Sequence, residues 1–465
     1  MRIHWHREDL RLADNAALGD PSDPFVGLFV FDPAICAYAG PPRLAFIHEA
    51  VEALRSAYRE RGGTLIVAHG DPRTVVPEIA NEYWADRVTW TRGYSGLARD
   101  RDDAVREGLA DRSVAHEAID DALCHEPGTI RTNAGDPYQV FTYFARKWHD
   151  RPVDAPYSRP APDQFAEVDD ERSMPTLSDL GEDAVEVDLP PATPTAARDR
   201  LDRFCSEPIF SYRMDRDSPA REGTSRLSPY LAHGLVGPRT VYRATERARD
   251  SAPDEEAADN VHEFQDQLAW REFYRHVLYF SPSVVTENFK SYDNPIEWRS
   301  APADLAAWKA GETGYPIVDA GMRQLRDEAY MHNRVRMIVA AFLTKDLLID
   351  WREGYRWFRE HLLDHDTAND SGGWQWAAST GTDAQPYFRI FNPTSQCEQY
   401  DPDGEYVREY VPELRDVATE TIHEWPDLDQ GTRDRVAPGY PDPIVDHAAA
   451  RERALATFER ARGDD

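Results

Sequence analysis

The sequence predicts an α/β N-terminal domain with a parallel, Rossmann-like sheet, followed by an all-α C-terminal domain. Short apolar runs alternate with helical patterns through the first third of the chain, which is typical of a parallel sheet. After about residue 200 the strand signals fade, and apolar residues recur with helical spacing. A chain of 465 residues suits two domains. We expect them at residues 1–130 and 201–465, with a linker at 131–200.

Local patterns justify each element of the first domain. Apolar runs of strand length predict strands at Arg2–Trp5, Phe25–Phe31, Thr64–Ala68, Arg87–Trp90 and Val114–His116. Helical spacing between these runs predicts helices at Pro42–Arg61, Thr74–Glu82 and Ala98–Ala110. No GxGxxG segment follows the first strand, so the pattern does not support dinucleotide binding in this sheet.

The linker is acidic and proline-rich in its second part, residues 151–198. Low hydrophobicity and many prolines indicate a segment that wraps over a surface. Beyond the linker, helical spacing predicts helices at Asn260–Phe280, Gly314–Glu328, His332–Ile349, Gly354–Leu362 and Pro443–Arg462.

The charge balance restricts both the environment and the partners of the protein. There are 84 acidic and 53 basic residues, a formal net charge of −31, and only four of the basic residues are lysines. This composition predicts a halophilic protein, because in about 1 M salt a Debye length of roughly 3 Å hides exposed carboxylates from one another. An ordinary acidic protein is the alternative. Net charge cannot attract nucleic acid here, so DNA binding would need a local arginine patch.

The cysteines Cys36, Cys124, Cys205 and Cys397 are far apart and form no CxxC pair. We therefore expect reduced thiols and neither a disulfide framework nor a zinc ribbon. No apolar stretch reaches the roughly 18 residues of a membrane helix, and the first residues predict a strand and not a signal peptide. We expect a cytoplasmic protein without membrane contact.

Many tryptophans fall in the predicted helical domain: Trp270, Trp298, Trp308, Trp351, Trp357, Trp374 and Trp376. Core packing is the ordinary role of such side chains. A series of easily oxidised indoles could instead carry an electron inward from the surface, but that role requires a cofactor.

Two segments could hold such a cofactor. Glu222–Pro229 places three hydroxyls beside a glycine and ahead of a helix, which suits a phosphate, although a simple helix cap is the alternative. His361–Trp376 combines carboxylates, two glycines and Trp374, which suits the wall of a ring-binding site, with a solvated acidic loop as the alternative. Metal binding by His361, Asp364 and His365 is less favoured, because no HExxH segment or cysteine accompanies them, and we expect no metal.

Arg334 and Arg336 stand two residues apart on a predicted helix and so do not share a face. One of them can therefore reach a buried anion, and a bidentate pair with Asp364 would satisfy both charges. Two solvated arginines are the alternative.

Several long motifs, taken together and in order, resemble the photolyase/cryptochrome family. They are Trp5–Arg11 (WHREDLR), Trp270–Tyr274 (WREFY), Thr313–Ala320 (TGYPIVDA), Met331–Arg334 (MHNR), Gly372–Ser379 (GGWQWAAS) and Pro386–Arg389 (PYFR). The likeness covers nearly the whole chain. It is closest to the class I cyclobutane pyrimidine dimer photolyases of halophilic archaea.

The resemblance implies an enzyme, a carbon–carbon lyase that repairs cyclobutane pyrimidine dimers in UV-damaged DNA. Light would drive an electron from reduced FAD, bound in the helical domain, to a flipped-out dimer. The residues implied to bind FAD are Tyr212, Thr224, Ser225, Leu227, Ser228, Arg271, Asn333, Arg336, Asp364, Asp366 and Asp370. Trp374, Trp351 and Trp298 match an electron route from the flavin to the surface.

The resemblance also implies how DNA binds. Trp270 and Trp376 would flank the dimer, with Gln267 and Met337 against it. Arg216, Arg334 and Arg389 would approach phosphates. A dimer is poorly paired, so its extrusion costs less than that of a normal base, and aromatic walls can receive the rings. We expect a monomer.

Two positions depart from the repair enzymes. Gln267 stands where well-studied bacterial enzymes have a Glu that binds the dimer, and Asp370 stands where photolyases have an Asn and plant cryptochromes an Asp. These changes support an alternative, a blue-light photoreceptor that uses the same FAD. Repair is favoured because Trp270, Trp376 and Met337 keep the dimer pocket largely complete, and because no long signalling tail follows. A third possibility, repair of the (6-4) lesion, is not favoured, because the resemblance implies histidines for that activity at the two positions where Asn333 and Met337 stand.

The antenna is the last inference from the resemblance. Folate-binding relatives carry an Asn-Glu pair after a tyrosine in the fourth βα loop, and the segment Tyr94–Asp102 lacks it. Small residues there resemble relatives that bind 8-hydroxy-5-deazaflavin. An empty antenna site is the alternative.

Overall fold

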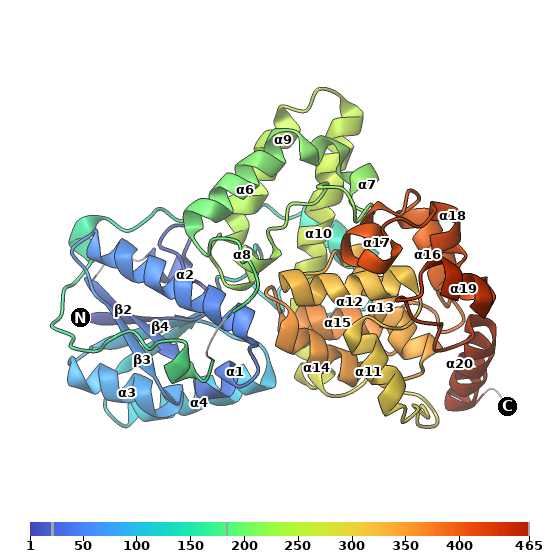
Figure 1. The fold of residues 1–465 in the computed structure, drawn as a ribbon. Coiled ribbons are helices and arrows are strands. Elements are labelled where there is room, and N and C mark those ends of the chain that lie inside the picture. The colour runs from blue at the N-terminus through green and yellow to red at the C-terminus, as the bar shows by residue number, and fades with distance from the viewer. Residues whose placement is uncertain (20–22, 183–184, 464–465) are drawn as a thin grey trace. The chain divides into compact units, whose positions relative to one another are not determined.

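The computed structural model describes residues 1–19, 23–182 and 185–463. A five-stranded parallel sheet occupies the N-terminal part and helices the C-terminal part, as the sequence predicts (Figure 1). The chain groups into two compact units. The sheet unit comprises Met1–Phe210, Ser225–Pro282 and Leu363–Ala368, and the helical unit comprises Ser211–Thr224, Ser283–Leu362 and Asn369–Asp465. The domain boundaries expected from the sequence stay a prediction.

The sheet contains the five predicted strands, each displaced by at most a few residues at its ends. They are β1 (Arg2–His6), β2 (Phe25–Phe31), β3 (Leu65–His69), β4 (Arg87–Thr91) and β5 (Ala115–Ile119). All pairs are parallel, and the order is β3-β2-β1-β4-β5. The chain therefore reverses its direction of progress between β1 and β4, and the carboxyl ends of these strands form a topological switch point.

Side chains of β1 alternate between the two faces of the sheet, as a strand requires. Ile3 and Trp5 point to one face, where they join a core built with α3 and α4. His4 and His6 point to the other face, where His6 meets Tyr58 of α2 with a ring-centroid distance of 5.8 Å. The sheet is thus covered by helices on both faces (Figure 1).

The helices of the sheet unit are α1 (Pro33–Cys36), α2 (Pro41–Arg59), α3 (Pro72–Glu82), α4 (Gly96–Ala110), α5 (Phe141–His149), α6 (Pro194–Ser206), α8 (Ser228–Ala232), α9 (Pro238–Asp250) and α10 (Glu255–Phe280). Helix α5 and the first part of α6 lie in the range 131–200, which was expected to be linker. Pro194 occupies the first turn of α6, and the Thr193 hydroxyl accepts a hydrogen bond from the backbone N–H of Ala196. A proline at this position starts a helix and does not break one. Residues 183 and 184 of the expected linker lie outside the described residues.

The helices of the helical unit are α7 (Tyr212–Asp215), α11 (Pro302–Ala310), α12 (Pro316–Glu328), α13 (Asn333–Ala341), α14 (Trp351–His361), α16 (Pro393–Tyr400), α17 (Glu405–Tyr410), α18 (Thr419–His423), α19 (Gln430–Val436) and α20 (His447–Arg462). Helix α15 (Thr367–Ala377) crosses the boundary between the units in sequence. Short 3-10 turns occur at Ala16–Leu18, Pro162–Gln164, Ser178–Leu180, Pro208–Ser211, Pro282–Val285, Pro412–Leu414 and Trp425–Asp427. Within the described ranges, no helix combines the length and the apolar character needed to span a bilayer.

One predicted helix, His332–Ile349, is interrupted in the structure. The α-helical part ends at Ala341, and a π-helical turn (η6, Phe342–Asp346) follows. The Thr344 hydroxyl donates to the carbonyl of Ala340 at 2.7 Å and so competes for a backbone acceptor. Side-chain periodicity does not reveal such a change here, because residues 338–349 are all buried and no single face is distinguished.

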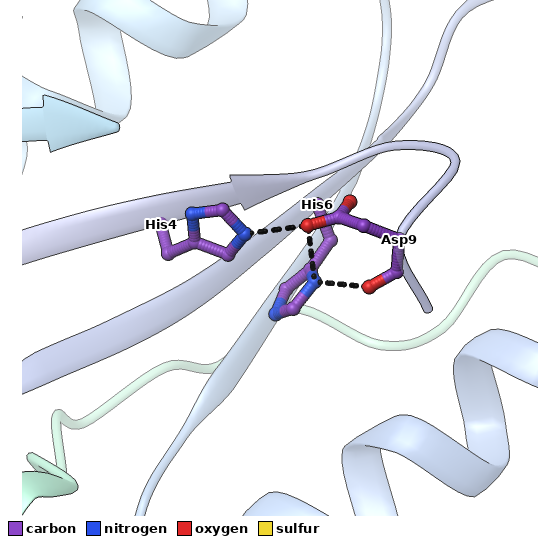
Figure 2. A group of neighbouring side chains, drawn as sticks. All are labelled: His4, His6 and Asp9. Carbon is purple, nitrogen blue, oxygen red and sulfur yellow. Dashed lines mark hydrogen bonds and ion pairs between the residues drawn. The ribbon is translucent and has the colours of Figure 1, made fainter. Parts of the chain in front are cut away.

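A buried polar network ties β1 to the loop that follows it (Figure 2). The His4 Nε2–H donates to Asp9 Oδ2 at 2.7 Å, and the His6 Nδ1–H donates to the backbone carbonyl of Asp9 at 3.0 Å. Asn15 Nδ2 and the backbone N–H of Arg7 also donate to the Asp9 carboxylate, at 3.0 and 2.7 Å. Burial by itself raises the pKa of Asp9, but the two histidines outweigh it and hold this pKa well below its usual range.

Three histidines of the sheet unit are buried in neutral form. Burial lowers the pKa of His4 to about 4, that of His233 to about 4 and that of His276 to about 3. In the unfolded chain each imidazole takes up a proton near pH 6.5. The unfolded state therefore binds more protons between about pH 6.5 and 4, and the free energy of unfolding falls as the pH is lowered through this window.

We predict that His233→Gln makes this pH dependence shallower by about one proton, or about 1.4 kcal/mol per pH unit at the steepest point. Glutamine can still donate to the carbonyl of Leu363, which His233 Nε2 contacts at 2.9 Å, but it does not titrate. Denaturant unfolding from pH 7 to 4 at constant KCl measures the slope. The exposed His116→Gln is the matched control and should keep the wild-type slope. Equal slopes in all three proteins would contradict the prediction.

Candidate functional site

Three tryptophans singled out by the sequence lie in the aromatic core of the helical unit. Trp374 of α15 and Trp351 of α14 are buried, with exposed fractions of 2% and 0%, whereas Trp298 is half-buried at the edge of this core. The set therefore runs from the interior toward solvent. This gradient is what an indole route to the surface requires, and it is also compatible with core packing alone.

Trp374 is held by close packing on all sides. A Cβ added to Gly354 would lie 2.0 Å from Cη2 of Trp374, so only glycine leaves room for this ring. Phe358 and Trp308 contact the indole edge-to-face, with ring-centroid distances of 5.0 and 6.0 Å. The Trp374 Nε1–H is buried and has no hydrogen-bond partner among the residues that the structure describes. A buried donor of this kind costs free energy unless a bound group accepts from it.

The other two indoles have defined partners. Trp351 Nε1 donates to Asn288 Oδ1 at 2.9 Å, and the Arg352 guanidinium lies over the same ring, 4.8 Å from its centroid. Trp298 contacts Phe458 of α20 at 6.0 Å between ring centroids. Each indole is thus locked in one orientation by neighbours within the helical unit.

Helix α13 presents several of the predicted site residues at its start. Asn333 is exposed, Met337 one turn later is half-buried, and both lie on one face because they are four residues apart. Arg334 binds Asp217 at 2.8 Å and lies over the Tyr400 ring, 4.3 Å from its centroid. Arg336 donates to the carbonyl of Met331 at 2.8 Å. The two arginines therefore have different surroundings, as their spacing predicts.

The segment before α8 belongs in part to each unit. In the helical unit, Tyr212 is buried, and the Arg216 guanidinium lies over its ring at 5.5 Å. Thr224 is half-buried. A Cβ added to Gly223 would lie 2.4 Å from the Cβ of Asp215, so the chain makes a close turn here.

In the sheet unit the same segment continues with Ser225, Leu227 and Ser228. Leu227 is buried, and its backbone N–H donates to the Ser225 hydroxyl at 3.3 Å. Arg226 between them has a φ of +47°, an uncommon left-handed conformation for a residue other than glycine. The hydroxyls of this loop are therefore positioned by a strained turn.

Helix α10 places two arginines one turn apart in the interior of the sheet unit. Arg271 donates to the carbonyl of Ala122 at 2.9 Å. Burial and the nearby Arg275 lower the pKa of Arg271 to about 10. Burial opposes the charge of Arg275 as well, but the Asp366 carboxylate outweighs it and raises the pKa of Arg275. The charge of Arg275 is thus balanced by Asp366, whereas the buried guanidinium of Arg271 would be stabilised by a further anion.

Arg275 was not identified from the sequence. Its guanidinium pairs with the Asp366 carboxylate and lies 3.5 Å from Glu8. Asp366 also accepts from the backbone N–H of Ala368 at 3.0 Å and so caps α15. The partners are 91 residues apart, and no local pattern connects them. Only its position four residues after Arg271 on one helix face could have indicated the role.

Trp270 of α10, which is expected to form one wall of the dimer pocket, packs on another ring of the sheet unit, and its role as a wall stays a prediction. Trp270 stacks on Phe141 of α5 with parallel rings, 3.8 Å between centroids and 10° between planes. Gln267, one turn earlier, donates to the carbonyl of Glu263 at 3.3 Å. Phe141 is an unpredicted part of this wall, because α5 was expected to be linker.

The remaining predicted residues are distributed between the units. Asp364 is buried in the sheet unit, whereas Asp370 and Trp376 are half-buried and Arg389 is exposed in the helical unit. The joint roles of the predicted FAD-binding and DNA-binding residues stay a prediction.

The groups that bring metal-ligating atoms together in the structure differ from His361, Asp364 and His365, the group considered from the sequence. His361 stacks on Trp357 at 3.7 Å between centroids, and its Nδ1 donates to the carbonyl of Trp357. Among the described residues, two other groups bring three ligand atoms within 4.8 Å of one another: His4, His6 and Asp9, and His149, His262 and Asp266. Neither group follows a sequence motif.

We predict that Gly354→Ala destabilises the protein by about 1–3 kcal/mol, because the new methyl group must displace the Trp374 ring. Gly373→Ala is the matched control, since a Cβ at this helical position meets no atom within 4 Å. Alanine there should leave the free energy of unfolding unchanged or raise it by up to about 1 kcal/mol. Denaturant unfolding measures both. Equal stability of the two variants would contradict this packing.

Comparisons with known proteins agree with the geometry. Residues 2–163 match the family of DNA photolyase, and residues 264–460 match the FAD binding domain of DNA photolyase. The chain is 56% identical to the deoxyribodipyrimidine photo-lyase of Halobacterium salinarum over 481 aligned residues, which cover 100% of each protein. It is also similar to the solved class III photolyase of Agrobacterium tumefaciens, with 36% identity, a TM-score of 0.90 and coverage of 99% of this chain and 98% of that one. A Synechocystis cryptochrome structure matches with 26% identity and a TM-score of 0.91, covering 98% of this chain and 99% of that one. The chain belongs to the photolyase/cryptochrome family.

Proposed function

We propose that this protein is a deoxyribodipyrimidine photo-lyase, which uses light to repair cyclobutane pyrimidine dimers in DNA. The observation that carries the proposal is the 56% identity, along the full length of both chains, to a protein of that name. The fit of residues 264–460 to the FAD binding domain of DNA photolyase supports the same chemistry.

The residues present suit FAD as the cofactor. Within the described part of the chain, the buried Trp374 N–H lacks an acceptor. The buried Arg271 has a lowered pKa, which an anion such as a phosphate would raise again. When bound in reduced form, FAD supplies a light-excited donor of one electron. The residues proposed to hold it are Tyr212, Thr224, Ser225, Leu227, Ser228, Arg271, Asn333, Arg336, Asp364, Asp366 and Asp370.

The three indoles of the helical unit have a proposed task of their own. Trp374 delivers an electron inward, Trp351 replaces it, and Trp298 at the edge of the core is the member nearest to a reductant in solution. Trp374 and Trp351 are almost fully buried, with exposed fractions of 2% and 0%, so water does not reach the inner part of this route. This route prepares the reduced enzyme and takes no part in each repair event.

On the substrate side, Trp270 and Trp376 are proposed to flank the everted dimer, with Met337 against it. Phe141 fixes the plane of Trp270 by stacking on one of its faces, so the indole is already oriented before DNA binds. A pre-oriented wall reduces the entropy that binding must overcome. Gln267 would offer an amide N–H and an amide oxygen to the dimer, and it cannot donate a carboxyl proton.

Arginines must supply the attraction for DNA, because the net charge of −31 opposes it. Arg216, Arg334 and Arg389 are proposed to meet phosphates near the lesion. Arg334 is held by Asp217, so a phosphate has to displace or share with that carboxylate. High salt weakens each phosphate contact further. Affinity therefore depends mainly on the shaped pocket for the dimer.

The second candidate, a blue-light photoreceptor, rests on Asp370 alone, and the names of the relatives support repair over it. The two functions share the cofactor and differ in whether DNA is repaired. The acidic composition and the likeness to a Halobacterium protein support adaptation to high salt in either case. We further propose a cytoplasmic monomer.

We predict that the reduced holoprotein restores the two thymines of a thymine-dimer oligonucleotide under blue light and not in the dark. The assay is run in molar KCl, with restored thymines counted by chromatography. No repair by protein that retains FAD would favour the photoreceptor.

Trp298→Phe separates the electron route from the repair step. The variant should be reduced slowly by light when it starts with oxidised flavin, yet it should repair at the wild-type rate when it is reduced chemically beforehand. Loss of both activities would show that Trp298 has a structural role only.

The sheet unit is proposed to bind 8-hydroxy-5-deazaflavin as an antenna at the switch point of the sheet. Arg7 follows β1 and donates to Asp102 at 2.7 Å, and Arg101 of α4 donates to Asp32 at 3.2 Å. Both guanidiniums lie over Trp5, 4.9 and 5.5 Å from its ring centroid. Burial and the neighbouring Arg7 lower the pKa of Arg101. Two clustered cations suit a chromophore with an ionisable hydroxyl.

We predict a near-visible absorption band, separate from the flavin bands, in protein purified from cells that make deazaflavins. Arg101→Met should weaken or remove this band and leave the flavin bands unchanged, because it removes one of the two cations. A spectrum with flavin bands alone would indicate that the antenna site is empty.

A further inference from the structure

A second group of potential ligands lies at the surface of the sheet unit, away from the residues assigned to FAD and DNA. His149 ends α5, and His262 and Asp266 stand one turn apart on α10. His149 and His262 border a surface pocket of about 460 Å³ that is also lined by Glu246 and Arg249 of α9. Nothing in the proposed repair reaction uses these side chains.

The geometry of the group is that of a partly formed metal site. His149 Nε2 lies 2.7 Å from Asp266 Oδ1, and the two imidazole rings are 4.3 Å apart between centroids. One ligand atom from each residue lies within 4.8 Å of the other two. The i, i+4 spacing of His262 and Asp266 places both on one helix face. Three ligands thus converge from two helices.

The two helices form a rigid support. Trp148, next to His149, is fully buried, and its Nε1 donates to Glu272 of α10 at 2.7 Å. The stack of Phe141 on Trp270 fixes the other end of α5 against α10. Ligands carried by locked helices keep their spacing better than ligands on loops.

We propose that His149, His262 and Asp266 bind one divalent transition-metal ion of the zinc class, with water in the open coordination position. Two imidazoles and a carboxylate, with a position left for solvent, are ligands that Zn²⁺ accepts. With Zn–ligand bonds of about 2.0–2.2 Å, neighbouring ligand atoms stand about 3.3 Å apart around a tetrahedral ion. The His149–Asp266 contact, 2.7 Å long, needs to open by only about 0.6 Å to reach this separation. Both side chains are partly exposed, with 20% and 28% of their surface accessible.

The arginines that line the pocket do not prevent metal binding. Arg249 binds Glu246 at 3.1 Å, Arg243 donates to the carbonyl of Val153, and Arg151 donates to Thr129. Each guanidinium therefore already has an acceptor. Their residual positive charge weakens the site, so the expected affinity is lower than that of a buried structural zinc site.

The other ligand-like group, His4, His6 and Asp9, makes a useful contrast. All three side chains are fully buried. The ring nitrogens of His4 contact Thr89 and Asp9, and those of His6 contact Asp9 and Tyr58. An ion would have to enter without a water path and replace several satisfied hydrogen bonds. The group of His149, His262 and Asp266 is open to solvent, and only the contact between His149 and Asp266 would have to change.

Binding would clamp α5 to α10 and so stabilise the folded state, because an ion that binds only the native protein shifts the unfolding equilibrium. Helix α10 also carries Gln267 and Trp270. A metal bound by His262 and Asp266 in its N-terminal half would thus stiffen the support of the proposed dimer wall without touching the reaction.

The test is isothermal titration calorimetry of untagged holoprotein with ZnCl₂, in the salt that keeps the protein folded and with that salt in both solutions. We expect one saturable site and a melting temperature that rises with Zn²⁺. His262→Gln and Asp266→Asn should each weaken the site by about ten-fold or more. Neither change disturbs a buried residue.

His69→Gln is the matched control, because His69 is an exposed histidine of the same unit outside the group. It should bind Zn²⁺ as the wild type does. The proposal is wrong if the wild type shows no saturable binding, or if both His262→Gln and Asp266→Asn bind as tightly as the wild type. The latter result would mean adventitious binding elsewhere on the surface.

Discussion

Direct packing of the Trp374 ring on the backbone of Gly354 is the contact around which the helical unit is organised. Because a Cβ at residue 354 would lie 2.0 Å from the indole, α14 and α15 can approach closely only with glycine there. This approach seats Trp374 between Phe358 and Trp308 and brings it into the same core as Trp351. The core that stabilises the unit and the proposed electron route are therefore the same set of rings. A substitution that disturbs the packing of this core therefore also disturbs the proposed electron route.

The arrangement of charge follows from the excess of carboxylates and the near absence of lysine. Arginine side chains are held in position by acidic groups and aromatic rings. Arg239 pairs with Asp14 and Asp121 in the interior of the sheet unit, and Arg334 lies between Asp217 and Tyr400 in the helical unit. A planar guanidinium can satisfy two partners at once, which an ammonium group does less well. A protein with a net charge of −31 can in this way keep a few cations oriented for phosphates.

Helix α10 connects several features of the sheet unit. One face carries Arg271 and Arg275 into the interior, where Asp366 balances the second charge. Gln267 and Trp270 stand nearer its middle, and Phe141 of α5 fixes the ring of Trp270. Its N-terminal half bears His262 and Asp266, one turn apart, beside His149. Because α5 packs along this helix, the position of α5 affects both the aromatic wall and the surface ligand group.

The sequence by itself determined the elements whose signals are local and repeated. Apolar runs of strand length placed all five strands, and helical spacing placed α2, α3, α4, α10, α12, α14 and α20. Long motifs such as Trp270–Tyr274 and Gly372–Ser379 also identified the family, because a resemblance over many residues does not depend on knowing their contacts. The sequence could not show that α5 and α6 occupy part of the expected linker, since prolines at a helix start and in a linker look alike.

Only the tertiary structure decided which side chains meet. The pairing of Arg275 with Asp366 joins residues 91 positions apart. His149 comes next to Asp266 across 117 positions. The fit of Trp374 depends on a glycine in a different helix. The physical reason is the same in each case: hydrogen bonds, ion pairs and ring contacts act over a few ångströms, and those distances are set by how the helices pack and not by the order of residues along the chain.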